Sequence, residues 1–190
     1  MTTQQKWDNI YQQKQVKPTV AEVLQHNHYL LPEKGVALDL ACGVGGNALF
    51  LAAKGLTVQA MDISPNAIAT LQQYAREQSL TIAAEVRDVI AKPPAPMSVD
   101  VLIVSHFLSR ELCLDLARAV RPGGLLLYQT YCANKVRATG PNNPDYLLED
   151  NELLRLFPRM RLRVYREEST LGQHHLGMRN QAWAVLEQAK

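Results

Sequence analysis

The sequence predicts an α/β fold: an open sheet of seven strands, mostly parallel with the last strand antiparallel, and helices on both faces. Between residues 36 and 130, apolar stretches of strand length alternate with helical patterns, an order typical of parallel strands joined by right-handed crossovers. A glycine cluster at residues 43–46 lies where the first strand turns into a helix. The last two apolar stretches, 161–168 and 181–187, are joined by about a dozen residues without a helical pattern. So short a link favours an antiparallel pair.

The composition limits the kind of protein and its partners. With 190 residues, of which 47% are hydrophobic and 20% charged, the chain suits one ordinary globular domain. Its net charge is +2 and no block of like charge stands out, so we expect no nucleic-acid partner. No stretch approaches the roughly 20 apolar residues of a membrane span, and the first residues carry no apolar leader pattern. Cys42, Cys113 and Cys132 lack metal-type spacing and indicate reduced thiols. Together these observations predict a cytoplasmic protein without a membrane partner, and they indicate no oligomeric state.

The N-terminal part of the sequence predicts two helices and a turn. Residues 3–14 have the pattern of a polar helix with one aromatic face. Thr19 and Glu22 have the spacing of a capping box, which predicts a second helix over about 19–30. A turn at 31–35 then leads into the first strand.

From residue 36 onward, strands and helices alternate. Gly55 ends the helix that follows the glycine cluster, and Ser64 with Pro65 has the pattern of a helix start. Ser109 is expected to cap a later helix, which Arg121-Pro122-Gly123-Gly124 stops. The expected strands are residues 36–40, 57–61, 80–86, 99–105, 125–129, 161–168 and 181–187, and the expected loop and helix before the last pair are residues 130–149 and about 150–157.

The glycine cluster and an acidic residue after it predict a nucleotide-type cofactor. Glycines are needed where the backbone turns sharply and lets a ligand approach its N–H groups. Asp62 lies 19 residues beyond Gly43, at the end of the next apolar stretch. That is about the spacing at which a carboxylate meets a ribose. Gly43, Gly45 and Ala48 also fit G-x-G-x-x-A, which leaves a dinucleotide open. We therefore expect a cofactor that contains adenosine.

Three features favour a cofactor other than a dinucleotide. Asp39 lies within the first strand, and a carboxylate there suits a cationic ligand better than a pyrophosphate. The nucleotide fold uses the whole chain, so no separate substrate domain remains. A terminal antiparallel pair is also not the usual end of a dinucleotide fold.

Five stretches follow one another in an order and spacing that carry a family resemblance. They are Leu-Asp-Leu-Ala-Cys-Gly-Val-Gly-Gly (38–46), Met-Asp-Ile-Ser (61–64), Arg-Asp-Val (87–89), Asp-Val-Leu-Ile-Val-Ser (100–105) and Arg-Pro-Gly-Gly-Leu (121–125). Together they resemble the motifs of the class I S-adenosylmethionine-dependent methyltransferases. Residues 46–55 are similar to the first helix of the small enzymes of the tellurite-resistance type. The resemblance implies one Rossmann-like methyltransferase domain over 1–190, with an N-terminal helical lid region at 1–30 and a core at 36–190.

The resemblance implies how S-adenosylmethionine, the cofactor of this family, would be held. Asp39 would orient the amino group of its methionine part, directly or through water. Asp62 would accept hydrogen bonds from both ribose hydroxyls. Asp88 would accept from the adenine amino group, with Ile63 and Val89 on the two faces of the ring.

The resemblance also places the reacting end of the cofactor. The backbone at Ala41, Gly43 and Gly45 would pass close under it, and Ser105, His106 and Phe107 would flank the methyl donor. A general base is needed only where the acceptor must lose a proton. Because histidine titrates near neutral pH, His106 is the candidate catalytic residue; its alternative role is that of a polar residue on the pocket wall.

Two aromatic residues of the N-terminal helix, Trp7 and Tyr11, have two possible roles. The helix either packs on the domain or forms a lid whose rings cover the cofactor and attract its sulfonium. We favour the lid, because a polar helix with two aromatic residues needs a surface on which to dock.

Substrate groups are expected on loops at the carboxyl ends of the parallel strands, namely residues 105–110, 130–149 and the link that holds His174 and His175. No third ligand with suitable spacing accompanies these histidines, so no metal is expected. The favoured function is methyl transfer to a small-molecule acceptor whose identity the sequence does not reveal. Two alternatives stay open: an NAD-dependent oxidoreductase and a non-catalytic module that binds S-adenosylmethionine.

Overall fold

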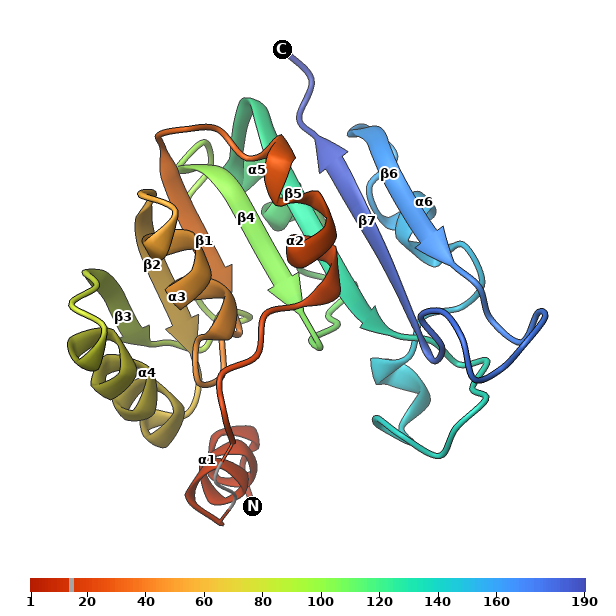
Figure 1. Ribbon diagram of the computed structural model, residues 1–190, viewed down its shortest axis with the longest axis horizontal. Coiled ribbons are helices and arrows are strands. Elements are labelled where there is room, and N and C mark those ends of the chain that lie inside the picture. The colour runs from red at the N-terminus through yellow and green to blue at the C-terminus, as the bar shows by residue number, and fades with distance from the viewer. Residues whose placement is uncertain (14–15) are drawn as a thin grey trace.

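The computed structural model describes residues 1–13 and 16–190, so residue 14, the expected end of the first helix, lies outside the described residues. One sheet of seven strands, in the order β3-β2-β1-β4-β5-β7-β6, forms the centre of the molecule (Figure 1). The strands are β1 (Val36–Leu40), β2 (Thr57–Asp62), β3 (Ile82–Val86), β4 (Val99–Ser105), β5 (Val120–Tyr131), β6 (Arg161–Glu167) and β7 (Gln181–Glu187). The expected seven strands and their order along the chain are confirmed.

The pairing of the strands explains where a ligand site forms. β1 pairs in parallel with both β2 and β4, and β7 runs antiparallel to both β5 and β6. After β3 at one edge, the chain crosses to the other side of β1 to form β4. Such a switch in strand order opens a crevice at the carboxyl ends of the two central strands, where open α/β sheets bind ligands.

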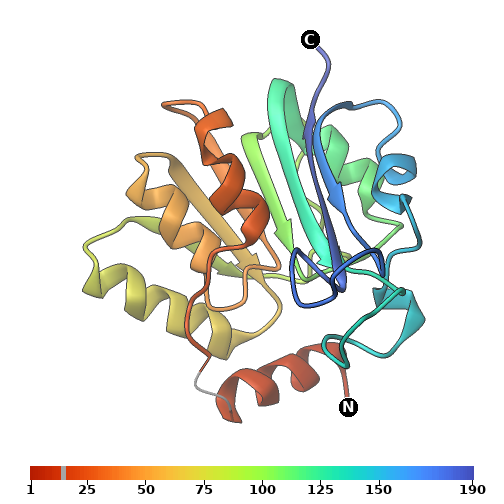
Figure 2. The ribbon, with the colours of Figure 1, turned by 45° about the vertical axis from the view of Figure 1, so that its right-hand side comes forward.

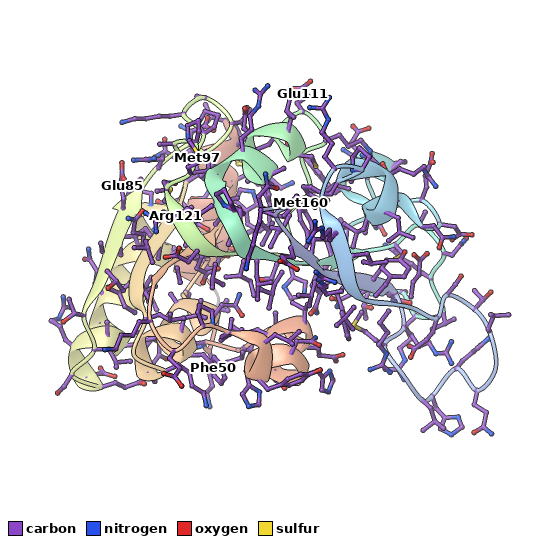
Figure 3. All side chains as sticks on the ribbon, turned by 90° about the horizontal axis from the view of Figure 1, so that it is seen from above. Phe50, Glu85, Met97, Glu111, Arg121 and Met160 are labelled. Atoms are coloured by element: carbon purple, nitrogen blue, oxygen red, sulfur yellow. The ribbon has the colours of Figure 1, made fainter. Side chains whose placement is uncertain are left out.

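Helices cover both faces of the sheet. One face carries α2 (Glu22–Asn27), α3 (Gly46–Ala53) and α4 (Pro65–Glu77), and the other carries α5 (Cys113–Ala119) and α6 (Glu152–Leu156). Phe50 of α3 and Glu111, just before α5, accordingly lie on opposite sides of the sheet (Figure 3). Each face has its own buried apolar cluster, as expected for a sheet that is covered on both sides.

Three shorter elements complete the chain. α1 (Thr3–Gln13) lies across the carboxyl edge of the sheet, and the short helices η1 (His28–Leu30) and η2 (Pro144–Tyr146) interrupt loops (Figure 2). Of the helices that the structure describes, none has the length and apolar character needed to cross a membrane.

The two serine caps that the sequence predicts have different outcomes. The Ser64 side chain accepts a hydrogen bond from the Ala67 N–H at 3.2 Å, and Pro65 is the first residue of α4, which confirms the predicted start. Ser109 is wrong as a cap of α5. The N-cap is Leu112, whose N–H donates to the Ser109 carbonyl oxygen at 3.2 Å.

The predicted capping box of the second helix is also wrong. Helix α2 begins at Glu22 after Ala21, without a side-chain cap. The Ala21 N–H donates instead to Asn47 Oδ1 at 2.8 Å. The backbone of Thr19 passes so close to Gly46 that a Cβ at Gly46 would lie 2.0 Å from the Thr19 carbonyl oxygen. A long-range contact with the start of α3 therefore replaces the local cap.

The fifth strand is longer than expected. It begins at Val120, directly after α5, so the predicted turn at residues 121–124 lies inside the strand. Gly123 adopts the left-handed φ of +80°, and its N–H donates to the Gln188 carbonyl oxygen at 2.9 Å. The pairing with β4 shifts register between Val99 and Val101, which accommodates the glycines within the sheet.

Candidate functional site

A cavity of about 330 Å³ lies at the carboxyl edge of the parallel strands, at the lower end of the size range of small-molecule sites, roughly 300–1,000 Å³. Helix α1 runs across the strand ends at this edge (Figure 2). Most of the predicted site residues line the cavity: Trp7, Tyr11, Ala41, Gly43, Asp62, Ile63, Asp88, Val89, Ser105 and His106. Asp39 and Gly45 do not belong to the lining residues.

The glycine turn between β1 and α3 has two sides with different roles. Gly43 has a φ of +53°, and a Cβ added to it would lie 2.6 Å from the Tyr11 hydroxyl, so this glycine faces the cavity and α1. Gly45 has a φ of +80°, and its Cβ would lie 2.2 Å from Leu71 of α4. Ala41 has a φ of +54°, unusual for a residue with a side chain. The turn therefore needs one glycine for the cavity and one for packing.

Asp62, the last residue of β2, connects this turn to the cavity. Its Oδ2 accepts from the Gly43 N–H at 2.8 Å, and its Oδ1 accepts from the Ser64 N–H at 2.9 Å. Burial raises the pKa of Asp62, although the bonds from the backbone of Ser64, Gly43 and Ile63 oppose that rise. A carboxylate offers about four acceptor positions, so one on each oxygen remains for a ligand.

Asp39 of β1 does not line the cavity, but its partner Asn47 does. The Asp39 side chain is fully buried and accepts from the Ala48 N–H at 3.0 Å and from Asn47 Nδ2 at 3.5 Å. Burial raises its pKa to about 7, against the opposing effect of the two hydrogen bonds. Its contact with a ligand amino group stays a prediction.

Residues that follow β2 and β3 form another part of the cavity wall. Ile63 and Val89 both line it, and Val89 is buried. Asp88 Oδ1 accepts from the N–H groups of Ile90 and Ala91, at 3.0 and 3.2 Å. These bonds fix the turn that carries the carboxylate and leave the second carboxylate oxygen without a protein donor among the described residues.

Helix α1 is anchored over the cavity by one carboxylate. Asp8 Oδ1 accepts from the Ser64 hydroxyl at 2.7 Å and from the Asn66 N–H at 2.9 Å, both at the start of α4. These bonds lower the pKa of Asp8. The Trp7 and Tyr11 rings stack with centroids 6.2 Å apart, and both line the cavity. The structure thus brings the two aromatic residues to the place where a lid is expected.

His106 follows β4 directly and also lines the cavity. It has a left-handed φ of +57°, and its N–H donates to the Gln129 carbonyl oxygen at 2.8 Å. Its Nε2 lies 3.2 Å from Gln181 Oε1, and its ring centroid lies 5.3 Å from that of Tyr131. The surrounding protein lowers the pKa of His106, because burial disfavours the charged ring.

Two of the three expected substrate loops are tied together. Arg110 donates to the carbonyl oxygens of Asp145 and Leu147, both at 2.9 Å, and pairs with Glu152 at 2.6 Å. The third loop differs: His174 and His175 are exposed outside the residues that line the cavity, and His174 Nε2 contacts the Thr170 carbonyl oxygen at 2.7 Å.

Three polar residues that contact predicted site residues had no sequence signal of their own. Asn47 donates to the Ser105 hydroxyl at 3.0 Å and lies within the glycine motif, where the motif drew attention to the glycines instead. Gln129 and Gln181 lie at strand ends as ordinary polar residues. Only the pairing of β5 with β7 brings them together. Phe107, which is predicted beside the methyl donor, also lines the cavity. Further lining residues outside the predicted set are Thr3, Val16, Lys17, Thr19, Cys42, Val44, Gly46, Asn47, Arg87 and Ile90.

The residues present fit a ligand that joins an adenosine to a positively charged group. Asp62 and Asp88 each keep acceptor capacity at the cavity wall. At Gly43 a side chain would collide with the Tyr11 hydroxyl, so a glycine here lets helix α1 pack close to the turn. The described residues contain no group of three or more His, Cys, Asp or Glu side chains arranged to hold a metal ion.

Comparison with known proteins gives a family match over part of the chain. A profile described as methyltransferase domain matches residues 37–124. The chain is 36% identical over 96 residues to hemagglutinin 1 of Eikenella corrodens, a match that covers 46% of this chain and 31% of that protein. It is 28% identical over 121 residues to YqeM of Bacillus subtilis (strain 168), which is named as a methyltransferase, with 60% and 49% covered. The chain spans half or less of the length of these curated relatives.

Solved structures share the fold over most of the chain. A protein of echinomycin biosynthesis, solved for the conversion of a disulfide bond into a thioacetal group, has a TM-score of 0.76 at 20% identity, with 99% of this chain and 93% of that chain covered. A SAM-dependent methyltransferase from Methanosarcina mazei has a TM-score of 0.69 at 19% identity, covering 90% and 99%. TehB from Haemophilus influenzae has a TM-score of 0.69 at 21% identity, covering 97% and 67%. At these identities the likeness shows a shared fold.

Proposed function

Since residues 37–124 belong to the methyltransferase domain family and the chain has the class I methyltransferase fold, we propose that the protein transfers a methyl group from S-adenosylmethionine to a small-molecule acceptor. S-adenosylmethionine is the cofactor of this family. The proposal covers the acceptor class, the roles of the site residues and the division of the chain into lid and core.

The observation that carries the proposal is the pairing of Asp62 with Gly43. A carboxylate at the end of β2 accepts the N–H of the glycine turn at 2.8 Å, and both residues line one cavity. This pairing supports the proposal because the Asp62 carboxylate can accept from sugar hydroxyls next to the glycine turn, and Asp88 lines the same cavity. A ligand that contains a sugar and an adenine base fits these two acceptors.

The chain contributes mainly by positioning. When bound, the cofactor would supply a methyl group activated by a sulfonium sulfur. Asp62 and Asp88 would hold the ribose and the adenine, while Asn47, through its bond to Ser105, fixes the wall beside His106. Correct positioning of two reactants is worth roughly 7–11 kcal/mol in the best model reactions. Methyl transfer by this chain therefore needs no large set of catalytic side chains.

Two features support a small acceptor. The cavity measures about 330 Å³ before any cofactor enters, at the lower end of the range for small-molecule sites, which favours a compact acceptor. Arg110, in the loop after β4, donates to the carbonyl oxygens of Asp145 and Leu147 and so holds two loops together beside the carboxyl edge of the sheet.

We also propose a single domain with a lid region at residues 1–30 on a core at 36–190, in a cytoplasmic protein; the free, buried state of all three cysteines supports that location.

Titration calorimetry tests the proposal. We expect S-adenosylmethionine and S-adenosylhomocysteine to bind with micromolar dissociation constants and NAD not to bind. The absence of binding by both sulfur ligands would reject the proposal. Stabilisation against thermal unfolding by NAD alone would favour the oxidoreductase alternative.

A screen with methyl-labelled cofactor and a panel of small thiols, hydroxyl compounds, amines and selenium or tellurium anions then identifies the acceptor. Binding of the cofactor without transfer to any member of the panel would favour a non-catalytic binding module.

A further inference from the structure

A continuous chain of hydrogen bonds connects α2 to the ring of His106. The Val23 N–H donates to Gln129 Oε1 at 2.8 Å, and Gln129 Nε2 donates to Gln181 Oε1 at 2.8 Å. The same Gln181 oxygen lies 3.2 Å from His106 Nε2. Gln129 is buried, with 3% of its surface exposed, so its amide has no room to reorient freely.

The direction of every hydrogen bond in this series follows from the first one, between Val23 and Gln129. A backbone N–H is always a donor, so the Gln129 atom facing Val23 must be the oxygen. The Gln129 atom facing Gln181 is then the NH₂ group, which only donates. Gln181 therefore presents its oxygen, and that oxygen accepts a second hydrogen bond from His106.

This order assigns the proton on the imidazole ring. A neutral imidazole carries one N–H and one lone pair, and the partner of one nitrogen decides which nitrogen holds the proton. Because Gln181 Oε1 only accepts, the proton sits on Nε2 of His106. Nδ1 keeps its lone pair and has no hydrogen-bond partner among the described residues.

The groups around His106 act on the pKa of its ring in opposite directions. Burial lowers this pKa, whereas the hydrogen bond with Gln181 and the charge of Glu22, at the start of α2, raise it. The oxygen that faces Nε2 belongs to an uncharged amide, and the adjacent ring is that of Tyr131. The net direction is downward, which favours the neutral form of the ring.

We propose that Gln181, held by Gln129, is a positioning residue that fixes His106 as the Nε2–H tautomer and leaves Nδ1 as a proton acceptor at the cavity. This inference rests on the proposed methyl transfer and deepens it by naming the acceptor class, a neutral thiol or hydroxyl group. The acceptor atom forms a bond to the methyl carbon while the carbon–sulfur bond of the sulfonium breaks, and the electron pair of that bond stays on sulfur. The proton of the acceptor passes to Nδ1 of His106.

Nuclear magnetic resonance of the ¹⁵N-labelled histidine side chains tests the tautomer in the ligand-free protein at pH 7.5. His106→Asn assigns the His106 signals among the five histidines. We expect a single Nε2–H form in the wild type and an averaged signal with a fraction of the Nδ1–H form in Gln181→Met, which lacks the acceptor. An Nδ1–H form or a charged ring in the wild type, or the same signal in both proteins, would overturn the proposal.

A second variant keeps the hydrogen bonds and changes only the charge. Gln181→Glu accepts from both Gln129 and His106, so its carboxylate should raise the pKa of His106 by about 1–3 units. The acid limb of the kcat profile should move upward by the same amount, while the KM for S-adenosylmethionine stays within about twofold. Gln72→Glu, the same substitution on the exposed face of α4, should leave the His106 titration unchanged. A kcat profile that does not follow the titration of His106 contradicts the role of Nδ1 as proton acceptor.

The proposed methyl transfer and the proposed role of Gln181 can be rejected independently of each other. Loss of cofactor binding in calorimetry would reject the methyl transfer and leave the tautomer measurement valid. A wrong tautomer would reject the positioning role while the cofactor still binds.

Discussion

The two halves of the cavity are built from contacts of very different reach. On the side of β1 and β2, Asp62 bonds to Ser64 across 2 residues and to Gly43 across 19, and Asp8 bonds to Ser64 across 56. On the side of β4, β5 and β7, Gln129 bonds to Val23 across 106 residues, and His106 to Gln181 across 75. The first half is therefore mainly a property of one βαβ unit to which α1 is added, whereas the second exists only after the whole sheet has formed.

The halves also differ in their chemistry. Carboxylates and backbone N–H groups form the first half, which suits the recognition of hydroxyl and amino groups. Neutral amides and an imidazole form the second, which suits the movement of a proton. The comparison predicts that substitutions in the first half change cofactor affinity, and that those in the second change the rate and its pH dependence.

Asp62→Ala should have the largest effect. It removes two hydrogen bonds to a charged acceptor, each worth roughly 1.5–3 kcal/mol, so the affinity for S-adenosylhomocysteine should fall about 100-fold or more in calorimetry. Asp115→Asn, a change to an acidic residue of α5 outside the cavity, should bind normally. A loss of less than tenfold in Asp62→Ala would show that the ribose is held elsewhere.

Asp39→Asn should change how stability depends on pH. In the folded chain Asp39 has a pKa of about 7, against 3.8 as its ordinary value. The folded state therefore holds a proton that the unfolded state has lost, and the stability present below pH 4 decreases as the pH rises toward 7. The free energy of unfolding decreases with a slope of up to about 1.4 kcal/mol per pH unit.

Chemical denaturation from pH 4 to 8 measures this difference. Asp39→Asn should remove that part of the slope, while Asp115→Asn should keep it. Parallel curves for the wild type and Asp39→Asn would contradict the raised pKa.

Gly46→Ala should disrupt the contact between the glycine turn and the backbone of Thr19. Its Cβ would meet the backbone of Thr19 at 2.0 Å, so the segment that leads from α1 to α2 must move, at a cost of about 1–3 kcal/mol. Gly55→Ala is the control, because a Cβ there meets nothing within 4 Å and only the left-handed φ of +90° opposes it. The temperature of thermal unfolding and the affinity for the cofactor should both decrease in Gly46→Ala. Normal cofactor affinity in that variant would show that the segment plays no part in closing the site.

Trp7→Ala should give the smallest and most selective effect. If the ring attracts the positive sulfur, about 0.5–2 kcal/mol of affinity for S-adenosylmethionine is lost, while the neutral S-adenosylhomocysteine binds nearly as before. Tyr29→Ala removes an exposed aromatic residue outside the cavity and should change neither affinity. An equal loss for both ligands would indicate that Trp7 acts by packing and not by its attraction for charge.

The same difference in reach explains what the sequence could reveal. The Ser64–Pro65 helix start, the glycine turn and the position of Asp62 depend on residues close in the chain, and their signals are visible in the sequence. The capping box at Thr19 failed because Asn47, in another element, offered the Ala21 N–H a better acceptor.

Gln129 and Gln181 illustrate the opposite case. Neither residue differs by type or spacing from other polar residues at strand ends, and no local pattern indicates that the two amides meet. Their role depends on the register in which Gln181 of β7 lies opposite Tyr131 of β5, a pairing that only the folded sheet defines.

The Tyr11 hydroxyl has a kinetic consequence. A Cβ added to Gly43 would lie 2.6 Å from this hydroxyl, so Tyr11 covers the glycine backbone. A ligand that binds against this backbone must first displace helix α1, which Asp8 anchors to the start of α4. In stopped-flow measurements the observed rate constant of association should consequently reach a plateau at high ligand concentration. The plateau equals the rate constant at which helix α1 opens. Asp8→Ala should raise that plateau.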